Sequence, residues 1–231
     1  MSILVECRNL NHSYAKSRAL ENINLTIESG KIVGLFGPNG SGKTTLIKKL
    51  TGMIHDESGS VSICGNPIGE KTKALVSYSP DCIAYNKSSR VCELLDMYET
   101  MYADFDRQKA ENTLDMFEIG KDNYVGKLSK GNAETLQIIL TMSRNAKLYI
   151  LDEPFNGVDP VAKENIIKVV LKNVPEESSI LITTHHLDEI EQILDDAIFI
   201  KGGKIILHKS VDDLRDENGK SLIDTYKEEF R

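Results

Sequence analysis

The stretch FGPNGSGKTT, Phe36 to Thr45, decides how the rest of the chain is interpreted. From Gly37 to Thr44 it matches the pattern GxxxxGK[ST], and it lies between a short apolar run and an amphipathic one. Glycines allow the backbone to curl so that successive N–H groups point inward, and the dipole of the following helix adds attraction for anions. The stretch therefore predicts a rigid phosphate-binding loop.

Two side chains at the end of this loop have predicted roles of their own. Lys43 places a positive charge on the β- and γ-phosphates of a nucleotide, and Thr44 offers a hydroxyl to Mg²⁺. Without its place between a strand and a helix, the same composition would be a glycine-rich turn with an incidental lysine. The predicted nucleotide-binding residues here are Gly37, Pro38, Asn39, Gly40, Ser41, Gly42, Lys43, Thr44 and Thr45.

Composition narrows the classes of protein that fit the chain. With 231 residues, 40% of them apolar, we expect one domain over 1–231, with or without a subdomain. A net charge of −7 argues against a broad basic surface for nucleic acid or for an anionic membrane face. The four scattered cysteines are typical of reduced thiols inside a cell. The sequence shows neither a signal peptide nor a run of about twenty apolar residues that could span a bilayer.

Short apolar runs alternate with amphipathic stretches, which is the pattern of an α/β protein. A helix is expected directly after the phosphate loop, over 43–53. The expected strands are an antiparallel set at 3–10 and 19–27, buried strands at 32–36, 148–153 and 179–185, and a terminal hairpin of 197–200 with 204–208.

Between about 90 and 145 the apolar residues recur with helical spacing instead. We expect helices over 92–105, 106–117 and 131–145, with Asp106 as the N-cap of the second. The sequence thus predicts a P-loop NTPase core, with an N-terminal antiparallel β subdomain and a helical subdomain inserted at about 82–145.

Two acidic residues form a second candidate site. Asp152 and Glu153 follow the predicted strand Leu148–Leu151, at the carboxyl end of a strand, where ligands bind in open α/β sheets. Asp152 is a candidate partner of Mg²⁺, and Glu153, which we expect to face the other way on the pleat, can polarise the attacking water. Two acids that end a strand can also form a solvated turn. Their combination with Lys43 favours the nucleotide site.

The ordered motifs GPNGSGKTT, LSKGN, LYILDEP and ITTHH resemble those of the nucleotide-binding subunits of ATP-binding cassette (ABC) transporters, over essentially the whole chain. The most specific motif is Leu128–Asn132, which resembles the LSGGQ signature of the family. By residue type alone, Ser129 and Gly131 present a hydroxyl and free N–H groups to an anion, or form an ordinary helix cap. The resemblance implies that both contact the γ-phosphate held by Lys43 of a second cassette, in a homodimer or heterodimer that closes on ATP.

The resemblance also implies roles for residues outside these loops. His185 takes the position of the switch histidine, which contacts the γ-phosphate and holds the catalytic carboxylate, while His186 would point to the opposite side. Tyr14 lies where the family stacks an aromatic side chain on adenine, although a tyrosine packing on the β subdomain would leave the same pattern. Asn156–Asp159 resembles the loop that lines the dimer interface, and with Pro160 it is also a typical helix start.

Two positions depart from the family pattern. Asp81 stands where the family usually has glutamine, in the loop between core and helical insertion, and its side chain is charged and one methylene shorter. Asn132 replaces the glutamine of the signature. Both departures bear on the efficiency of hydrolysis more than on nucleotide binding, and an active ATPase is still predicted. The implied metal-binding residues are Thr44, Asp81 and Asp152, and the implied catalytic residues are Lys43, Glu153 and His185.

Three classes of function can be compared. The resemblance favours an ATPase that uses ATP and Mg²⁺ at the cytoplasmic face of the membrane and drives a separate permease docked near 81–105. The length and the segment 101–119 are similar to small bacterial export-type cassettes associated with antibiotic or bacteriocin resistance. Members that act on ribosomes or DNA carry two cassettes or long coiled coils, so no nucleic-acid partner is expected. A weakly hydrolysing regulatory ATPase is the alternative, motivated by Asp81 and Asn132.

Overall fold

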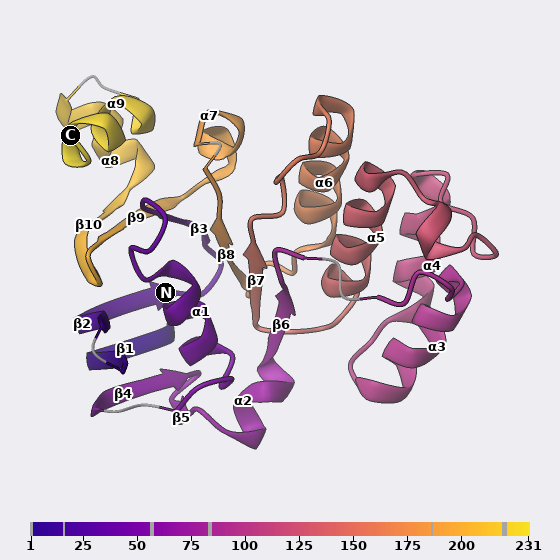
Figure 1. Cartoon of the computed structure of the whole chain (residues 1–231), viewed down its shortest axis with the longest axis horizontal. Helices are drawn as coiled ribbons and strands as arrows, with labels where there is room; N and C mark the ends of the chain where they lie inside the picture. Colours follow the sequence, from indigo (N-terminus) through magenta and orange to yellow (C-terminus); the bar gives the residue numbers. More distant parts are fainter. Residues whose placement is uncertain (1, 16, 56–57, 83–84, 186, 219–220) are drawn as a thin grey trace.

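The computed structural model describes residues 2–15, 17–55, 58–82, 85–185, 187–218 and 221–231, which form two sheets surrounded by helices (Figure 1). The smaller sheet is antiparallel, with strand order β2-β1-β4-β5. Its strands are β1 (Ile3–Tyr14), β2 (Ser17–Glu28), β4 (Ser58–Ile63) and β5 (Asn66–Pro67). Along β2, buried apolar residues alternate with exposed polar ones, as the sequence predicted: Leu20, Ile23, Leu25 and Ile27 are buried.

The larger sheet has the order β10-β9-β3-β8-β7-β6. Its neighbouring strands are parallel except for the hairpin of β9 with β10, which was predicted. The strands are β3 (Ile32–Phe36), β6 (Val76–Ser79), β7 (Leu148–Asp152), β8 (Ser179–Thr183), β9 (Asp196–Lys201) and β10 (Lys204–Ser210). Because both faces of this sheet are covered, its central strands are continuous apolar runs.

The larger sheet separates two apolar cores, because the antiparallel sheet and α1 (Lys43–Leu50) cover one of its faces and the remaining helices cover the other. One core joins Leu148 and Ile150 of β7 to the antiparallel sheet and α1, and the other joins Tyr149 and Leu151 to the remaining helices. Those helices are α3 (Val91–Met101), α4 (Arg107–Met116), α5 (Lys130–Met142), α6 (Pro160–Asn173), α7 (Leu187–Ile190), α8 (Val211–Asn218) and α9 (Leu222–Glu229). The helix α2 (Glu70–Leu75) leads into β6, and short 3₁₀ turns occupy Val125–Lys127 and Glu191–Ile193. Within the described ranges, no helix is long and apolar enough to cross a bilayer.

The helices α3, α4 and α5 lie together at one end of the molecule, between β6 and β7 in sequence (Figure 1). They match the predicted helical insertion, whose limits of about 82 and 145 stay a prediction. Asp106 is the N-cap of α4, as predicted, and its side chain accepts a hydrogen bond from the N–H of Lys109 at 2.9 Å. Ser129 likewise caps α5 by accepting from the N–H of Asn132 at 3.1 Å.

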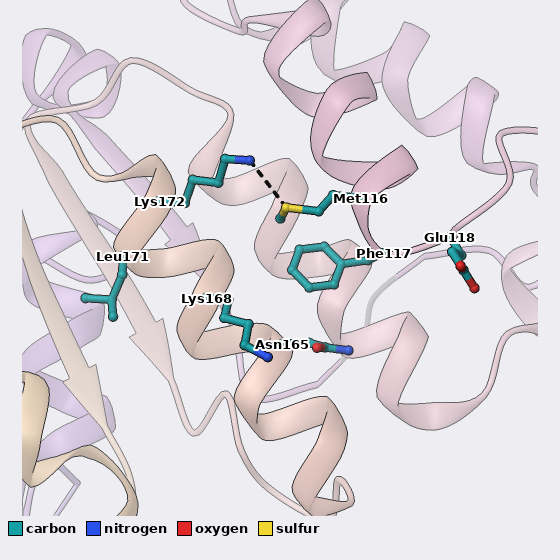
Figure 2. Close-up of a pocket in the computed structure, with 7 residues that line it drawn as sticks. All are labelled: Met116, Phe117, Glu118, Asn165, Lys168, Leu171 and Lys172. Carbon is teal, nitrogen blue, oxygen red and sulfur yellow. Dashed lines mark hydrogen bonds between the residues drawn. The ribbon is translucent and has the colours of Figure 1, made fainter.

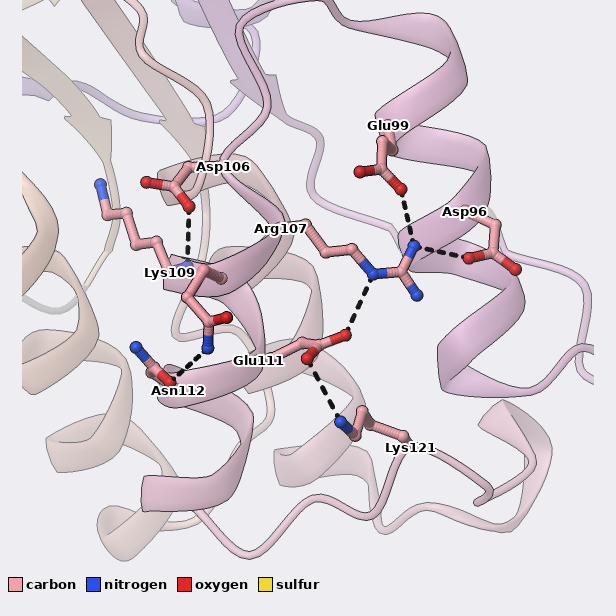
Figure 3. A network of polar contacts seen from close by, with 9 residues as sticks. Asp96, Glu99, Asp106, Arg107, Lys109, Glu111, Asn112 and Lys121 are labelled. Carbon is pink, nitrogen blue, oxygen red and sulfur yellow. Dashed lines mark hydrogen bonds and ion pairs between the residues drawn. The ribbon is translucent and has the colours of Figure 1, made fainter.

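A cluster of charged side chains holds α4 against α3 (Figure 3). Arg107 contacts Asp96 at 2.6 Å and Glu99 at 2.7 Å on α3, and Glu111 at 3.0 Å on its own helix. Lys121 extends the cluster with a contact of 3.3 Å to Glu111. Because these side chains are in contact with water, their ion pairs are screened and the cluster adds little to stability.

The first helix of the insertion ends earlier than its periodicity predicted, at Met101 rather than 105. The reason is Arg144, a buried residue just after α5. Its guanidinium lies over the ring of Tyr102 at 4.1 Å and forms two hydrogen bonds to Asp104, at 3.0 and 3.1 Å. Phe105 pairs with the backbone of Arg144 in an isolated bridge. The segment 102–105 therefore leaves the helix in a turn, closed by a hydrogen bond from the N–H of Phe105 to the carbonyl of Tyr102 at 3.1 Å, that faces Arg144.

We expect the substitution Arg144→Met to lower the free energy of unfolding by about 3 kcal/mol, because it leaves Asp104 and the backbone carbonyls of Val76 and Ala74 without their donor. Urea denaturation measures this change. Lys147→Met is the matched control: it removes an exposed ion pair with Glu177, and we expect a loss of less than about 0.5 kcal/mol. Equal losses for the two variants would show that Arg144 is not the anchor.

Candidate functional site

The phosphate loop and the predicted acidic residues line a single cavity of about 330 Å³. Its walls come from the loop after β3, the start of α1, and the segments that follow β6, β7 and β8. Because β3, β6, β7 and β8 are parallel, their carboxyl ends meet at one edge of the sheet. The lining residues are Asn39, Gly40, Ser41, Gly42, Lys43, Thr44, Thr45, Asp81, Asp152, Glu153, Asn156 and His185.

Close packing, as well as glycine content, makes the phosphate loop rigid. A Cβ atom on Gly37 would overlap the carbonyl oxygen of Ile200 and lie 2.7 Å from the hydroxyl of Ser41. Gly42 has φ of 114°, and a Cβ atom there would lie 2.7 Å from the carbonyl oxygen of Ala19. Gly42 is also the N-cap of α1 and supplies no side-chain cap, so the first N–H groups of the helix stay available for an anion.

Lys43 lies against the loop that it follows. Its ammonium group donates hydrogen bonds to the carbonyl of Gly37 at 2.7 Å and of Pro38 at 3.4 Å. Burial lowers the pKa of Lys43, and the nearby charges of Glu153 and Asp152 oppose that effect. The positive charge is therefore placed beside the loop and the two carboxylates.

Asp152 is the last residue of β7 and is buried. Its carboxylate accepts a hydrogen bond from the hydroxyl of Thr183 on β8 at 2.6 Å. Burial raises the pKa of Asp152, and the hydrogen bond from Thr183 opposes this effect. Sequence reasoning missed this partner. The threonines of the motif ITTHH were a signal, because a hydroxyl at the end of a neighbouring parallel strand can reach the acid.

The expected placement of Glu153 on the pleat of the strand was wrong. The strand ends at Asp152, and Glu153 has a left-handed backbone with φ of 50°. Its N–H donates to the carbonyl and the hydroxyl oxygen of Thr183, both at 3.0 Å, which holds this uncommon conformation for a non-glycine residue. The backbone thereby turns both adjacent acids toward the same cavity. Burial is the largest influence on the pKa of Glu153 and raises it, while His185 and Lys43 lower it.

His185 lies beyond the end of β8, which stops at Thr183 rather than at 185 as predicted. Its ring nitrogen Nε2 lies 3.0 Å from Oε1 of Glu153, and its side chain is about half exposed. The structure thus brings His185 and Glu153 together, and both residues line the cavity. His186 falls outside the described residues.

Thr44, Asp81 and Asp152, the three predicted metal-binding residues, line the same cavity. Mg²⁺ commonly takes one or two carboxylates and completes its shell with waters and phosphate oxygens. Among the described residues, no group of three or more His, Cys, Asp or Glu side chains forms a site for a metal ion. A hydroxyl and two carboxylates beside a phosphate loop fit Mg²⁺ of this nucleotide-dependent kind.

Three predicted binding residues lie away from the cavity. Tyr14, at the end of β1, is 46% exposed and contacts His12 edge to face, with ring centroids 4.6 Å apart. Ser129 is exposed at the start of α5, which lies well away from α1 and the phosphate loop (Figure 1). Gly131 is packed on α6, where a Cβ atom would lie 2.6 Å from that of Ala162. Their roles stay predictions.

A larger hollow, of about 780 Å³, lies between the end of α4 and α6 (Figure 2). Met116, Phe117 and Leu171 give it apolar walls, and the Nζ of Lys172 lies 3.3 Å from the sulfur of Met116. Its lining has neither a glycine loop nor a pair of acidic residues. The smaller cavity is therefore the candidate site for phosphate chemistry.

Comparisons with known proteins agree with this assignment. A family model described as "ABC transporter" matches residues 20–156. The lantibiotic transport ATP-binding protein SrtF of Streptococcus pyogenes is 32% identical over 216 residues, covering 90% of this chain and 92% of that protein. The ABC transporter ATP-binding protein YtrB of Bacillus subtilis (strain 168) is 30% identical over 217 residues, covering 93% and 74% of the two chains. A solved ATP-binding subunit of an ABC transporter has a TM-score of 0.88 and 26% identity, covering 97% of this chain and 98% of that one. The fold class and the resemblance inferred from the motifs are confirmed.

We expect Gly42→Ala to weaken ATP binding by more than about tenfold, because the methyl group meets Ala19 and forces a residue with a Cβ into φ of 114°. Gly40→Ala is the matched control: its φ is 77°, but nothing lies within 4 Å of the added atom. Titration with a fluorescent ATP analogue measures both affinities, and urea denaturation checks that each variant folds. Equal losses would show that close packing does not shape the loop.

Proposed function

This chain belongs to the ABC transporter family as an ATP-binding subunit, and we propose that it hydrolyses ATP to power transport through a separate permease. The observation that carries the proposal is the shared cavity, in which Glu153 and His185 face the phosphate loop and Lys43. The relatives with known functions are named as transport or export ATP-binding proteins, so the alternative of a weakly hydrolysing regulator is not favoured. We further propose that 1–231 is one cassette domain with its helical insertion at about 82–145.

The residues of the cavity support a division of labour during hydrolysis. The N–H groups of the loop and Lys43 hold the β- and γ-phosphates, where negative charge develops as the bond to the leaving phosphate breaks. Thr44, Asp81 and Asp152 would hold Mg²⁺, which neutralises phosphate charge when bound. Glu153 orients the attacking water and accepts its proton, and its raised pKa makes it a better base than an ordinary carboxylate.

His185 supports the same step through its contact with Glu153. The ring nitrogen at 3.0 Å fixes the direction of that carboxylate, and the rest of the half-exposed ring is free to meet the γ-phosphate. A catalytic base at the end of a turn would otherwise sample several directions, which lowers the fraction of time in the reactive geometry. In this proposal, His185 orients the carboxylate of Glu153, and Glu153 acts as the base.

We propose that a second cassette completes the site. Ser129 is exposed at the start of α5, a helix that lies away from α1 (Figure 1), so a partner chain could bring its Ser129 and Gly131 to the γ-phosphate bound by Lys43. Tyr14 would stack on adenine. Two nucleotides would then bind more tightly to the closed pair than to separate chains, and this difference in affinity drives closure.

The motion of two closing cassettes would be passed to a separate permease docked near 81–105, at the cytoplasmic face of the membrane. The name of SrtF, a lantibiotic transport ATP-binding protein, supports an export-type transporter of the small bacterial kind. The proposal involves no nucleic acid, in keeping with the net charge of −7.

We expect Glu153→Gln to lower Mg²⁺-dependent phosphate release by at least about a hundredfold, because a neutral amide cannot accept the proton of the attacking water. ATP binding should persist, and sedimentation should show an ATP-dependent dimer. Lys43→Ala serves as the contrasting variant, which we expect to lose ATP affinity itself. Phosphate release by Glu153→Gln at the parental rate would show that this carboxylate is not the base.

A substitution at Ser129 tests separately whether a second cassette completes the site. Ser129→Arg should leave ATP binding to the single chain within about twofold of the parent, because Ser129 lies outside the cavity of its own chain. It should abolish the ATP-dependent dimer, because the larger side chain would not fit against the partner and would lack the hydroxyl that the proposed contact with the γ-phosphate uses. The test uses the Glu153→Gln background, in which hydrolysis does not dissolve the dimer. An unchanged dimer would place the interface elsewhere.

A further inference from the structure

A row of polar side chains runs along the face of α5 that packs on β6. Glu134, Gln137, Thr141 and Arg144 are three or four residues apart and so share one face, which continues past the last turn of the helix. Each is at most 9% exposed. Buried polar groups are costly unless they are hydrogen-bonded, so this face requires specific partners rather than general apolar packing.

Gln137 makes the contacts nearest to the nucleotide cavity. Its side-chain amide donates to the hydroxyl of Ser79 at 2.8 Å and to the carbonyl of Pro80 at 2.7 Å. Ser79 is the last residue of β6, and the carbonyl of Pro80 belongs to the peptide that joins it to Asp81. Because a peptide unit is planar, fixing this carbonyl also fixes the direction in which the backbone enters Asp81.

Further hydrogen bonds join the rest of β6 to α5 and to Arg144, just after it. The hydroxyl of Ser77 donates to the carbonyl of Thr141 at 2.8 Å, and Arg144 donates to the carbonyl of Val76 at 2.7 Å. The strand that ends near the cavity is thus held to α5 at both ends and in the middle. Ser129, at the start of α5, belongs to the same rigid assembly.

We propose that Gln137 is a positioning residue for Asp81: by holding the peptide between Pro80 and Asp81, it sets how far this short carboxylate reaches into the cavity beside Asp152. The proposal rests on the proposed function, in which Asp81 helps to bind Mg²⁺ with ATP. It also addresses the departure from the family at this position. A side chain one methylene shorter than glutamine depends more on where its backbone is placed, and Gln137 supplies that placement from α5.

The same contact links two parts of the proposed mechanism. Asp81 faces the nucleotide of its own chain, and Ser129 begins the helix proposed to cover the nucleotide of a partner. Since Gln137 lies on α5 between them and bonds to the peptide before Asp81, a shift of that loop moves α5 with it. The charge of Asp81 contributes to raising the pKa of Asp152, which agrees with its position near the metal-binding carboxylate.

The test measures how much Mg²⁺ tightens ATP binding, by calorimetry with and without the metal in the Glu153→Gln background. Gln137→Met, which keeps the length of the side chain but has no donor, should reduce that tightening by at least about tenfold and leave metal-free binding within about twofold. Gln137→Asn, which keeps the amide but is too short to reach Pro80, should act in the same direction and provides a second variant. Thr141→Val is the control, because the hydroxyl that it removes bonds within α5.

A double substitution shows whether Gln137 acts through Asp81. We expect Asp81→Ala alone to reduce the tightening, and Gln137→Met combined with Asp81→Ala to be no worse than Asp81→Ala, since the positioned group is already gone. Additive losses, or Gln137 variants that bind like the parent, overturn the positioning role. If Asp81→Ala leaves the tightening unchanged while Lys43→Ala still abolishes ATP binding, the positioning role fails and the proposed function stands. Loss of the proposed function would show instead as ATP binding that is indifferent to Lys43.

Discussion

The site depends on the parallel pairing of β3, β8, β7 and β6, which brings four separate segments to one edge of the sheet. Lys43, Asp81, Asp152 and His185 are far apart in sequence, and none of them reaches the others by local structure. Strand pairing fixes their spacing because each register places one strand end beside the next. The glycine loop then fits against Ile200 and Ala19 without room for side chains, so the phosphate-binding N–H groups are held before any ligand arrives.

This arrangement concentrates charge that the protein alone does not balance. Burial raises the pKa of both Asp152 and Glu153 and lowers that of Lys43, so each charged form is destabilised relative to water. Lys43 donates hydrogen bonds to two backbone carbonyl groups and lies in the electrostatic field of the two acids. In the proposed complex, a triphosphate would add negative charge beside the lysine and a divalent cation would add positive charge beside the acids, which would relieve both imbalances. The proposed binding would therefore draw on the electrostatic free energy of these buried groups.

Sequence patterns predicted those features of the structure that depend on residues close together in the sequence. The phosphate loop, the caps at Asp106 and Ser129, and the terminal hairpin follow from residue types at fixed spacing. The left-handed turn at Glu153 was not predictable, because it depends on Thr183 of a neighbouring strand. Likewise, the early end of α3 depends on a distant arginine. The strand β6 and the helices α8 and α9 were not foreseen, since short segments rich in polar residues show their role only when packed.

The polar face of α5 shows why such buried contacts carry more specificity than the exposed ones. The cluster around Arg107 contains more ion pairs, but its groups are in water and can exchange partners at little cost. Gln137 and Arg144 are buried, and a shift of one helical turn would leave several donors and carbonyls unsatisfied. The helix and β6 can therefore pair in only one register. That restriction holds α5 and the strand that ends two residues before Asp81 together as one unit, which the proposed coupling between nucleotide and partner requires.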